Sequence, residues 1–405
     1  MSRAGGPGTP APPLSIGFVA GEHSGDTLGA ALITALKERV PGVRCFGVAG
    51  PKMIAAGCEA WAGAEDLAVM GLAEVLTHLP RLLRLRGALL ERFRAARPDV
   101  FIGIDAPEFN LRVARGLKAR GIRTVQYVSP QVWAWRQGRV RTIGSACDLV
   151  LCLLPFETKF YEAHGVHAEF VGHPLADEIP LVSDKAAARA ALGLEGDAPL
   201  VALLPGSRLS EVTRLAAPFA AAAGVICARH PEYRFIAPMA SALTREAFAK
   251  EIAQLPAASG IRLLDGQAQR ALAACDAAIV ASGTATLETL LTGRPMVVAY
   301  RLSALTAFLA RTMGLVKVRY FSQPNLLAGR RVVPELFQEQ VTGPALAAAL
   351  LNELEDPQHV AELVSEFTAI HRTLRRGGAA RAADAVLACL EGAPSGGGEQ
   401  PVAPR

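Results

Sequence analysis

The chain has 405 residues, of which 51% are hydrophobic and 20% charged, with a formal net charge of +5. Its length exceeds what one hydrophobic core usually supports, so we expect a globular protein of two domains. The charge is modest and carries no nucleic-acid signature, and the sequence shows neither a signal peptide nor an apolar run of bilayer length. We therefore expect a cytoplasmic protein that is not integral to a membrane.

The chain repeats a short apolar strand, a turn marked by Gly or Pro, and a helical stretch. The continuous apolarity of these strands is typical of parallel sheets that are covered on both faces. Expected strands in the first half cover residues 16–20, 44–48, 100–104, 124–128, 149–153 and 169–171. After a polar connection the pattern restarts, with strands at 200–204, 234–237, 261–263, 277–280 and 296–299 and late helices over 343–354 and 356–390.

This pattern predicts an α/β protein with two doubly wound, Rossmann-like domains that face an interdomain cleft. We place the N-terminal domain at residues 15–180, the second domain at 181–345, and a set of C-terminal helices at 346–390. The Gly/Pro-rich tails, residues 1–14 and 391–405, are expected to be disordered.

Cysteine and histidine usage predicts neither disulfides nor a metal site. The seven cysteines are scattered without a C-x-x-C pair, mostly in apolar runs, and we interpret them as buried thiols of a reducing compartment. His164 and His167 have no cysteine or carboxylate at metal-ligand spacing nearby, so we interpret them as surface residues.

The stretch GEHSGDTLGA, residues 21–30, joins the first strand to a helix. Gly25 lets a ligand approach the backbone, and Ser24 or Asp26 can cap the helix. A capped tight turn explains the pattern as well as ligand contact through Glu22, Ser24, Gly25 and Asp26 does. A dinucleotide fingerprint G-x-G-x-x-G is absent.

Residues 70–86 combine an apolar surface with basic residues. The apolar members include Met70, Leu72, Val75, Leu76 and Leu79, and the basic ones are Arg81, Arg84 and Arg86. Such a segment suits an anionic lipid surface, although a core helix with a solvated basic end shows the same spacing.

Asp105 follows the strand at 100–104 in the stretch FIGIDAPEFN. A carboxylate at the end of a buried strand is costly unless it is solvated, paired or used in chemistry. We therefore interpret Asp105 as a candidate general base, the alternative being a cap of the next turn. The tryptophans of YVSPQVWAWR, Trp133 and Trp135, can stack on a sugar or line an acyl groove, but we interpret them as core residues.

Two turns of the second half predict anion sites. Ser207 and Arg208 follow the strand at 200–204, where helix N–H groups and a guanidinium can bind a phosphate. Ser282, Gly283 and Thr284 present a second helix N-terminus, and Glu288 lies one turn further, where it can accept two hydroxyl hydrogen bonds. Two anion sites and one hydroxyl acceptor together suggest a nucleoside diphosphate.

An ordered set of motifs resembles the lipid-A-disaccharide synthase family of Gram-negative bacteria. The set is GEHSGDTLGA, VAGPKM, GIDAPEFN, YVSPQVWAWR, LPFE, VGHPLAD, LLPGSR, LDG, ASGTATLE and SQPNLLAGR, between about residues 15 and 390. The resemblance implies a GT-B fold, Asp105 as base, Arg208 at the diphosphate, Ser282, Gly283, Thr284 and Glu288 around UDP, and Asn325 near the cleft. It also implies that the C-terminal helices return to the N-terminal domain. His23 stands where many relatives have a small residue, which argues against a catalytic role for it.

The reaction implied by the resemblance is an inverting transfer without cofactor. UDP-2,3-diacylglucosamine and 2,3-diacylglucosamine 1-phosphate (lipid X) give a β-1,6-linked disaccharide 1-phosphate and UDP at the cytoplasmic face of the inner membrane. The sequence contains no D-x-D triplet, so we expect no metal requirement. Two alternatives are another GT-B enzyme acting on UDP-N-acetylglucosamine, either a 2-epimerase or a transferase for a different lipid acceptor, and a non-catalytic nucleotide-sugar-binding protein at the membrane. The sequence predicts no oligomeric state.

Overall fold

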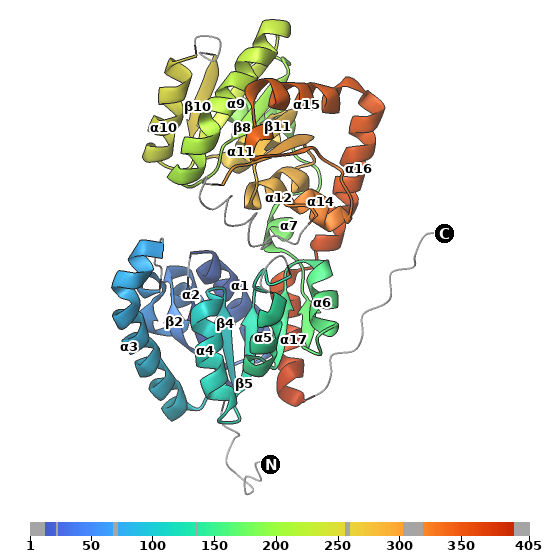
Figure 1. Ribbon diagram of the computed structural model, residues 1–405. Helices are drawn as coiled ribbons and strands as arrows, with labels where there is room; N and C mark the ends of the chain where they lie inside the picture. Colours follow the sequence, from blue (N-terminus) through green and yellow to red (C-terminus); the bar gives the residue numbers. More distant parts are fainter. Residues whose placement is uncertain are drawn as a thin grey trace, which may run out of the picture. The chain divides into compact units, whose positions relative to one another are not determined.

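The computed structural model describes residues 13–21, 23–67, 72–133, 137–255, 260–302 and 319–392, and for residues 72–79 it describes only the backbone. Contacts divide the chain into two compact units (Figure 1). The first comprises Met1–Pro174 and Arg376–Arg405, and the second comprises Leu175–Arg375. The two tails that the sequence predicts to be disordered fall, but for a few residues, outside the described ranges.

The first unit contains a parallel sheet of seven strands in the order β3-β2-β1-β4-β5-β6-β7. Most of the strand residues are buried, as expected for a sheet covered on both faces. The strands are β1 (Ser15–Ala20), β2 (Arg44–Ala49), β3 (Cys58–Gly63), β4 (Val100–Ile104), β5 (Arg123–Tyr127), β6 (Leu149–Cys152) and β7 (Ala168–Phe170).

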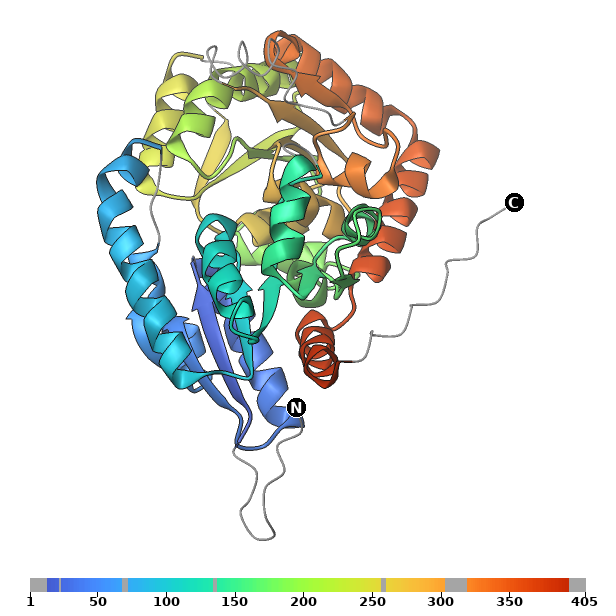
Figure 2. The same ribbon diagram turned by 60° about the horizontal axis from the view of Figure 1, so that its bottom comes forward.

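Helices cover both faces of this sheet because alternate strand residues point to opposite sides. Phe18 belongs to a core cluster that α1 and α17 complete, whereas its neighbour Val19 belongs to a cluster with α3, α4 and α5. Both views show α17, coloured red, within the first unit (Figure 2). The helices are α1 (His23–Arg39), α2 (Pro51–Ala55), α3 (Leu72–Ala96), α4 (Pro107–Lys118), α5 (Val140–Ala146), α6 (Pro155–Glu162) and α17 (Gly378–Glu391), with 3-10 turns η1 (Ala64–Asp66) and η2 (Gln137–Arg139).

The second unit contains a parallel sheet of six strands in the order β10-β9-β8-β11-β12-β13. Its largest described core cluster joins the strands to α9, α10 and α15. The strands are β8 (Leu200–Leu204), β9 (Arg234–Met239), β10 (Ile261–Asp265), β11 (Ala277–Ala281), β12 (Met296–Tyr300) and β13 (Glu335–Phe337). The helices are α7 (Pro174–Glu178), α8 (Lys185–Ala191), α9 (Leu209–Arg229), α10 (Ala242–Ala253), α11 (Ala268–Ala274), α12 (Thr284–Leu291), α14 (Gln323–Ala328), α15 (Gly343–Glu355) and α16 (Pro357–Leu374), with a 3-10 turn η4 (Gln338–Gln340).

The structure corrects the expected elements at three points. Strands β3 and β13 were not expected, because β3 carries exposed residues at the edge of its sheet and β13 has only three residues. The helix expected over 356–390 is two helices, since Gly377 adopts a φ of 67° between α16 and α17. Of the late helices, α17 packs on α1, whereas α15 and α16 belong to the second unit.

The strand order places the four turns with candidate functional residues in pairs. In each sheet the order reverses once, between β1 and β4 and between β8 and β11. Ligands of open α/β sheets bind at such reversals, beyond the carboxyl ends of the strands. The turns after β1 and β4 are therefore neighbours in the first unit, and the turns after β8 and β11 are neighbours in the second.

The cysteines are free thiols, as the sequence predicts. All seven are unpaired, and Cys227 alone among them is partly exposed. Burial raises the pKa of the Cys45 thiol to about 11. Within the described residues α9 is the one helix long and apolar enough to cross a membrane, and its apolar side chains form part of the core of the second unit.

Candidate functional site

A cavity of about 360 Å³ lies in the second unit at the carboxyl ends of its strands. The turns after β8 and β11 form two of its walls, and the ends of β9 and β10 supply the rest. Six of the seven residues predicted for the nucleotide line this cavity, and Asn325 does not. The six are Ser207, Arg208, Ser282, Gly283, Thr284 and Glu288.

The turn before α9 presents a guanidinium rather than open N–H groups. One Glu211 carboxylate oxygen accepts hydrogen bonds from the backbone N–H of Ser207 at 3.1 Å and of Arg208 at 3.2 Å. The Arg208 side chain is 78% exposed and forms an ion pair with the other oxygen at 3.4 Å. The N–H groups that the sequence suggests for a phosphate are thus occupied by Glu211, and the exposed positive charge at this turn is the Arg208 guanidinium.

The turn before α12 offers the open helix N-terminus of this cavity. No side chain caps the helix, and Gly283 stands before it at φ 150° and ψ −160°, a conformation open essentially to glycine alone. The Ser282 hydroxyl donates to the Phe321 carbonyl at 2.9 Å, which ties the turn to the segment before α14. Burial raises the pKa of the Glu288 carboxyl on the next turn of the helix. Uncapped N–H groups and the helix dipole make this terminus the better anion site of the two.

Asn325, in the SQPNLLAGR segment, is fully buried. Its Oδ1 accepts from the backbone N–H of Val332 at 2.7 Å and of Val333 at 2.9 Å, and its Nδ2 donates to the Val333 carbonyl at 3.0 Å. The amide is therefore committed to the backbone that follows α14, and it holds this loop rather than facing the cavity.

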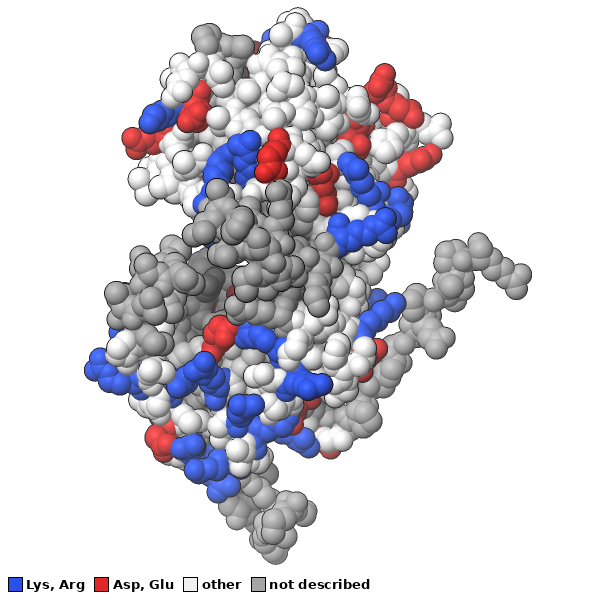
Figure 3. All heavy atoms as spheres, viewed as in Figure 1, with Lys and Arg blue, Asp and Glu red and all other residues white. Residues whose placement is uncertain are grey.

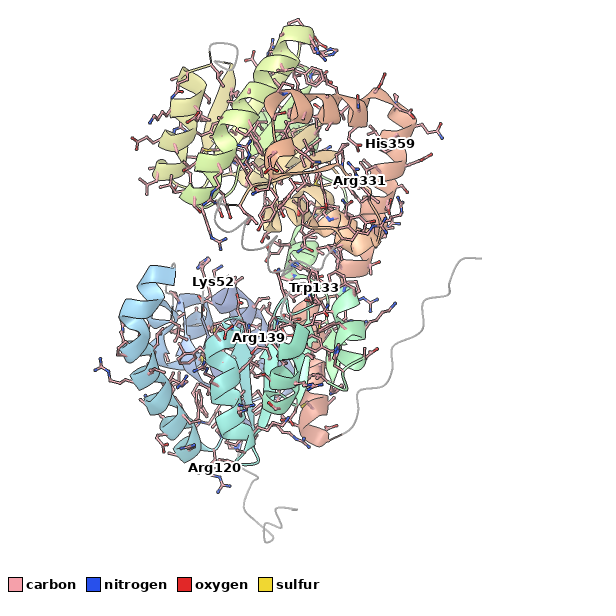
Figure 4. The ribbon with its side chains drawn as sticks, viewed as in Figure 1. Lys52, Arg120, Trp133, Arg139, Arg331 and His359 are labelled. Carbon is pink, nitrogen blue, oxygen red and sulfur yellow. The ribbon has the colours of Figure 1, made fainter. Side chains whose placement is uncertain are left out.

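A second cavity, of about 350 Å³, lies in the first unit beyond β4 and β5. Asp105 forms part of its wall, with Arg139 and the loop that includes Gln131. The Asp105 carboxylate accepts from the Ser24 hydroxyl at 3.3 Å and from the backbone N–H of Ala106 at 3.0 Å. Arg139 pairs with Glu108, another lining residue, at 2.7 Å. In Figure 4, Lys52, Trp133 and Arg139 lie at the end of this unit where the strands end, and Arg120 lies at the opposite end.

The GEHSGDTLGA turn is only partly directed at this cavity. Ser24 reaches Asp105, but Asp26 is 2% exposed and accepts from the backbone N–H of Lys52 at 3.0 Å and of Met53 at 2.9 Å. Asp26 therefore caps α2 instead of its own helix. Gly25 packs against β4 backbone within the unit, and Glu22 lies outside the described residues.

Behind the cavity of the first unit lies a buried polar network that the sequence reasoning missed. The Glu157 carboxylate accepts from the Trp133 indole N–H at 3.2 Å and from the Leu154 N–H at 3.1 Å. The Ser129 hydroxyl shares a hydrogen bond with Tyr161 at 3.0 Å. Burial raises the pKa of Glu157 to about 7. The only sign of this buried network in the sequence is a glutamate at the third position of a helix that begins at a proline.

The amphipathic stretch forms the beginning of α3. Met70 lies outside the described residues, and so do the side chains of Leu72, Val75, Leu76 and Leu79. Arg81 pairs with Asp66, Arg84 donates to the Pro80 carbonyl at 3.4 Å, and Arg86 is partly exposed. Further along α3, Leu89 and Phe93 enter the core.

Comparison with known proteins identifies relatives over nearly the whole chain. The family model of lipid-A-disaccharide synthetase matches residues 16–387. The lipid-A-disaccharide synthase of Alkalilimnicola ehrlichii is 52% identical over 381 residues, covering 94% of this chain and 99% of that protein. The enzyme of the same name from Serratia proteamaculans is 51% identical over 375 residues, covering 93% and 98%.

Solved structures resemble the fold at much lower identity. A putative UDP-N-acetylglucosamine 2-epimerase from Listeria monocytogenes aligns with a TM-score of 0.62 at 13% identity, covering 94% of this chain and 96% of that one. A calicheamicin glycosyltransferase aligns with a TM-score of 0.58 at 18% identity, covering 94% and 98%. These likenesses confirm the predicted GT-B architecture of two Rossmann-like domains.

Proposed function

The chain belongs to the lipid-A-disaccharide synthase family of glycosyltransferases, and we propose that it joins two acylated glucosamines in lipid A biosynthesis. The donor is UDP-2,3-diacylglucosamine, and the acceptor is 2,3-diacylglucosamine 1-phosphate. The acceptor 6-hydroxyl attacks the anomeric carbon of the donor and UDP leaves from the opposite face, so the configuration inverts. The observation that carries this proposal is the identity of 52% to a lipid-A-disaccharide synthase over 94% of the chain.

Asp105 is the proposed general base. A base must lie within hydrogen-bond reach of the attacking hydroxyl, at a place where substrate can enter. What supports this role is the position of its carboxylate in the wall of a cavity of about 350 Å³ at the carboxyl end of β4. The Ser24 hydroxyl, at 3.3 Å, supports a fixed orientation of one carboxylate oxygen. Ser24 with its neighbours Glu22, Gly25 and Asp26 then forms the acceptor-side loop.

Arg208 and the N-terminus of α12 are the proposed diphosphate site. Negative charge grows on the diphosphate as the glycosidic bond to UDP breaks, and groups that favour this charge lower the barrier. Support comes from the exposed guanidinium of Arg208 and from the uncapped helix that begins at Thr284 on the same cavity. The two turns that line this cavity also include Ser207, Ser282 and Gly283. Glu288 accepts hydrogen bonds from the ribose hydroxyls. Asn325 contributes by holding the loop after α14.

The proposal is tested by disaccharide formation from the two named substrates in excess EDTA. Replacing Asp105 with alanine is expected to lower kcat about 10² to 10⁴-fold, the usual contribution of a general base. Arg208→Ala is expected to lower it about 10² to 10³-fold through lost charge stabilisation. Matched controls are Asp384→Ala and Arg245→Ala, which remove exposed partners of surface ion pairs. A wild-type chain that binds UDP but makes no disaccharide would contradict the proposed activity.

We also propose that the first unit binds the cytoplasmic surface of the inner membrane peripherally, because both substrates carry acyl chains. The face with α3, α4 and α5 is rich in Lys and Arg (Figure 3), which suits anionic lipid. Met70, Leu72, Val75, Leu76 and Leu79 are the proposed apolar contacts, and Arg81, Arg84 and Arg86 the basic ones. The double variant Arg84→Glu/Arg86→Glu should sediment less with anionic vesicles, whereas Arg270→Glu in the second unit should not change sedimentation. Equal sedimentation of the double variant and the wild type would exclude this contact.

A further inference from the structure

The backbone leaves ordinary conformations at the ends of β4 and β5. Asp105 has a φ of 55°, Ala106 of 38° and Val128 of 74°. Positive φ is uncommon for residues with a side chain, and for a β-branched valine it is a true outlier. Such strain persists only where the surroundings impose it, and it gathers at functional sites. Here Asp105 and Val128 both line the cavity of the first unit.

Two buried amide side chains hold this backbone. Gln126, 1% exposed, places Nε2 at 3.1 Å from the Asp105 carbonyl oxygen and at 3.3 Å from those of Tyr127 and Val128. Asn110, fully buried, places Nδ2 at 2.8 Å from the same Asp105 oxygen. Neither amide lines the cavity. Both amides donate to the Asp105 carbonyl, Gln126 from β5 and Asn110 from α4.

Asn110 forms hydrogen bonds to this backbone through its Nδ2 group alone. The Nδ2 group also lies 3.2 Å from the carbonyl oxygens of Val19 and Ile104, so all its contacts are to the ends of β1 and β4. Its Oδ1 is buried and has no partner among the described residues. A buried acceptor without a partner is destabilising, so the amide is not optimal for packing. Its position is explained by the carbonyls that it holds.

The peptide between Asp105 and Ala106 links the amides to the carboxylate. Its oxygen accepts from Gln126 and Asn110, and its N–H, on Ala106, donates to Asp105 Oδ1 at 3.0 Å. Fixing the plane of this peptide therefore fixes one carboxylate oxygen. Ser24 holds the other oxygen at 3.3 Å.

We infer that Gln126 and Asn110 are positioning residues that aim the Asp105 carboxylate into the cavity through the Asp105–Ala106 peptide. The inference rests on the proposed role of Asp105 as base. Neither amide lines the cavity, so we assign neither a contact with substrate. Without them the peptide rotates towards an ordinary conformation, and the carboxylate loses its aim.

The test compares Gln126→Met and Asn110→Leu, which remove the donors, with Thr124→Val. Thr124 is the matched control because its buried hydroxyl bonds to Ala146 O at 2.8 Å at the other end of the same strand. We expect kcat to fall roughly tenfold to hundredfold in both amide variants, the cost of misplacing a reacting group. UDP affinity should be unchanged, which also reports folding of the second unit. The acidic limb of the pH profile of kcat/KM should shift, since the base changes its environment.

A second substitution, at Ala106, distinguishes a positioning role of the amides from a general loss of stability. Ala106→Gly removes the methyl group at a φ of 38° and keeps every hydrogen bond of this peptide. Glycine adopts this conformation without steric cost, so Ala106→Gly in the Gln126→Met background should recover part of the lost kcat. Gln126→Met and Asn110→Leu that match Thr124→Val in kcat and pH profile would overturn the inference.

These outcomes differ from those that contradict the proposed function. A wild type without product, or an Asp105→Ala variant with full activity, removes the activity or the base itself. An active wild type, an inactive Asp105→Ala and fully active amide variants would leave the base in place and remove only the inference.

Discussion

Gly283 at the beginning of α12 gives the sharpest test of the nucleotide site. A Cβ on this residue would meet no atom within 4 Å, so alanine fits the available space. The obstacle is the backbone, because at φ 150° and ψ −160° a residue with a side chain is strained by about 1–3 kcal/mol. Gly283→Ala must either hold the turn under this strain or rotate it. Rotation would turn the N–H groups of α12 away from the proposed diphosphate site.

The assay is UDP binding by titration calorimetry, combined with urea unfolding. If the strain is relieved by rotation, the Kd for UDP rises roughly fivefold to 150-fold. If the turn holds, the same cost lowers the stability of the second unit, which circular dichroism reports. All three tryptophans lie in the first unit, so their fluorescence does not follow this transition.

Gly87→Ala is the matched control in α3. There too a Cβ would meet no atom within 4 Å, but the residue is helical, so alanine should stabilise the first unit by about 1 kcal/mol. This variant should raise the urea midpoint of tryptophan fluorescence and leave UDP binding unchanged. Unchanged UDP affinity and unchanged stability in Gly283→Ala would refute the backbone argument.

Three further predictions concern the metal, the pH dependence and the core. Excess EDTA should leave the initial rate of disaccharide formation unchanged, since the proposed source of positive charge at the diphosphate is Arg208 with the α12 N-terminus. A rate restored only by added Mg²⁺ would contradict this. Burial raises the pKa of Glu157 to about 7, so folding favours its protonated form. The contribution of protonated Glu157 to the free energy of unfolding is fully present below about pH 4.5 and is lost as the pH rises through 7. This contribution is about 3 kcal/mol at most. Glu157→Gln should flatten this decline in tryptophan-monitored urea unfolding, and an unchanged slope would show that Glu157 does not cause it. Gly47→Ala should destabilise the first unit by more than about 3 kcal/mol, because Gly47 has a φ of 142° and its Cβ would lie 2.0 Å from the Phe18 carbonyl oxygen; a wild-type urea midpoint would contradict this.

The sequence alone determined the class of fold and the four turns that we propose for the chemistry. Continuous apolar runs identify buried parallel strands because hydrophobic pattern is a local property of the chain. The residues that follow such strands are at the ligand-binding edge of the sheet, whichever strands become neighbours. For that reason Asp105, Arg208, Gly283 and Glu288 could be selected before any contact was known.

Tertiary structure decided which polar groups remain available to a ligand. Asp26 caps α2, Asn325 binds the backbone of residues 332–333, and Glu211 occupies the N–H groups before α9. Each of these hydrogen bonds depends on how a loop folds or on which distant segments come into contact. Residue type and spacing do not specify these contacts. The same holds for Gln126 and Asn110, which are ordinary polar residues in the sequence. They converge on one carbonyl only because β4, β5 and α4 pack together, and long-range packing rather than local pattern sets that contact.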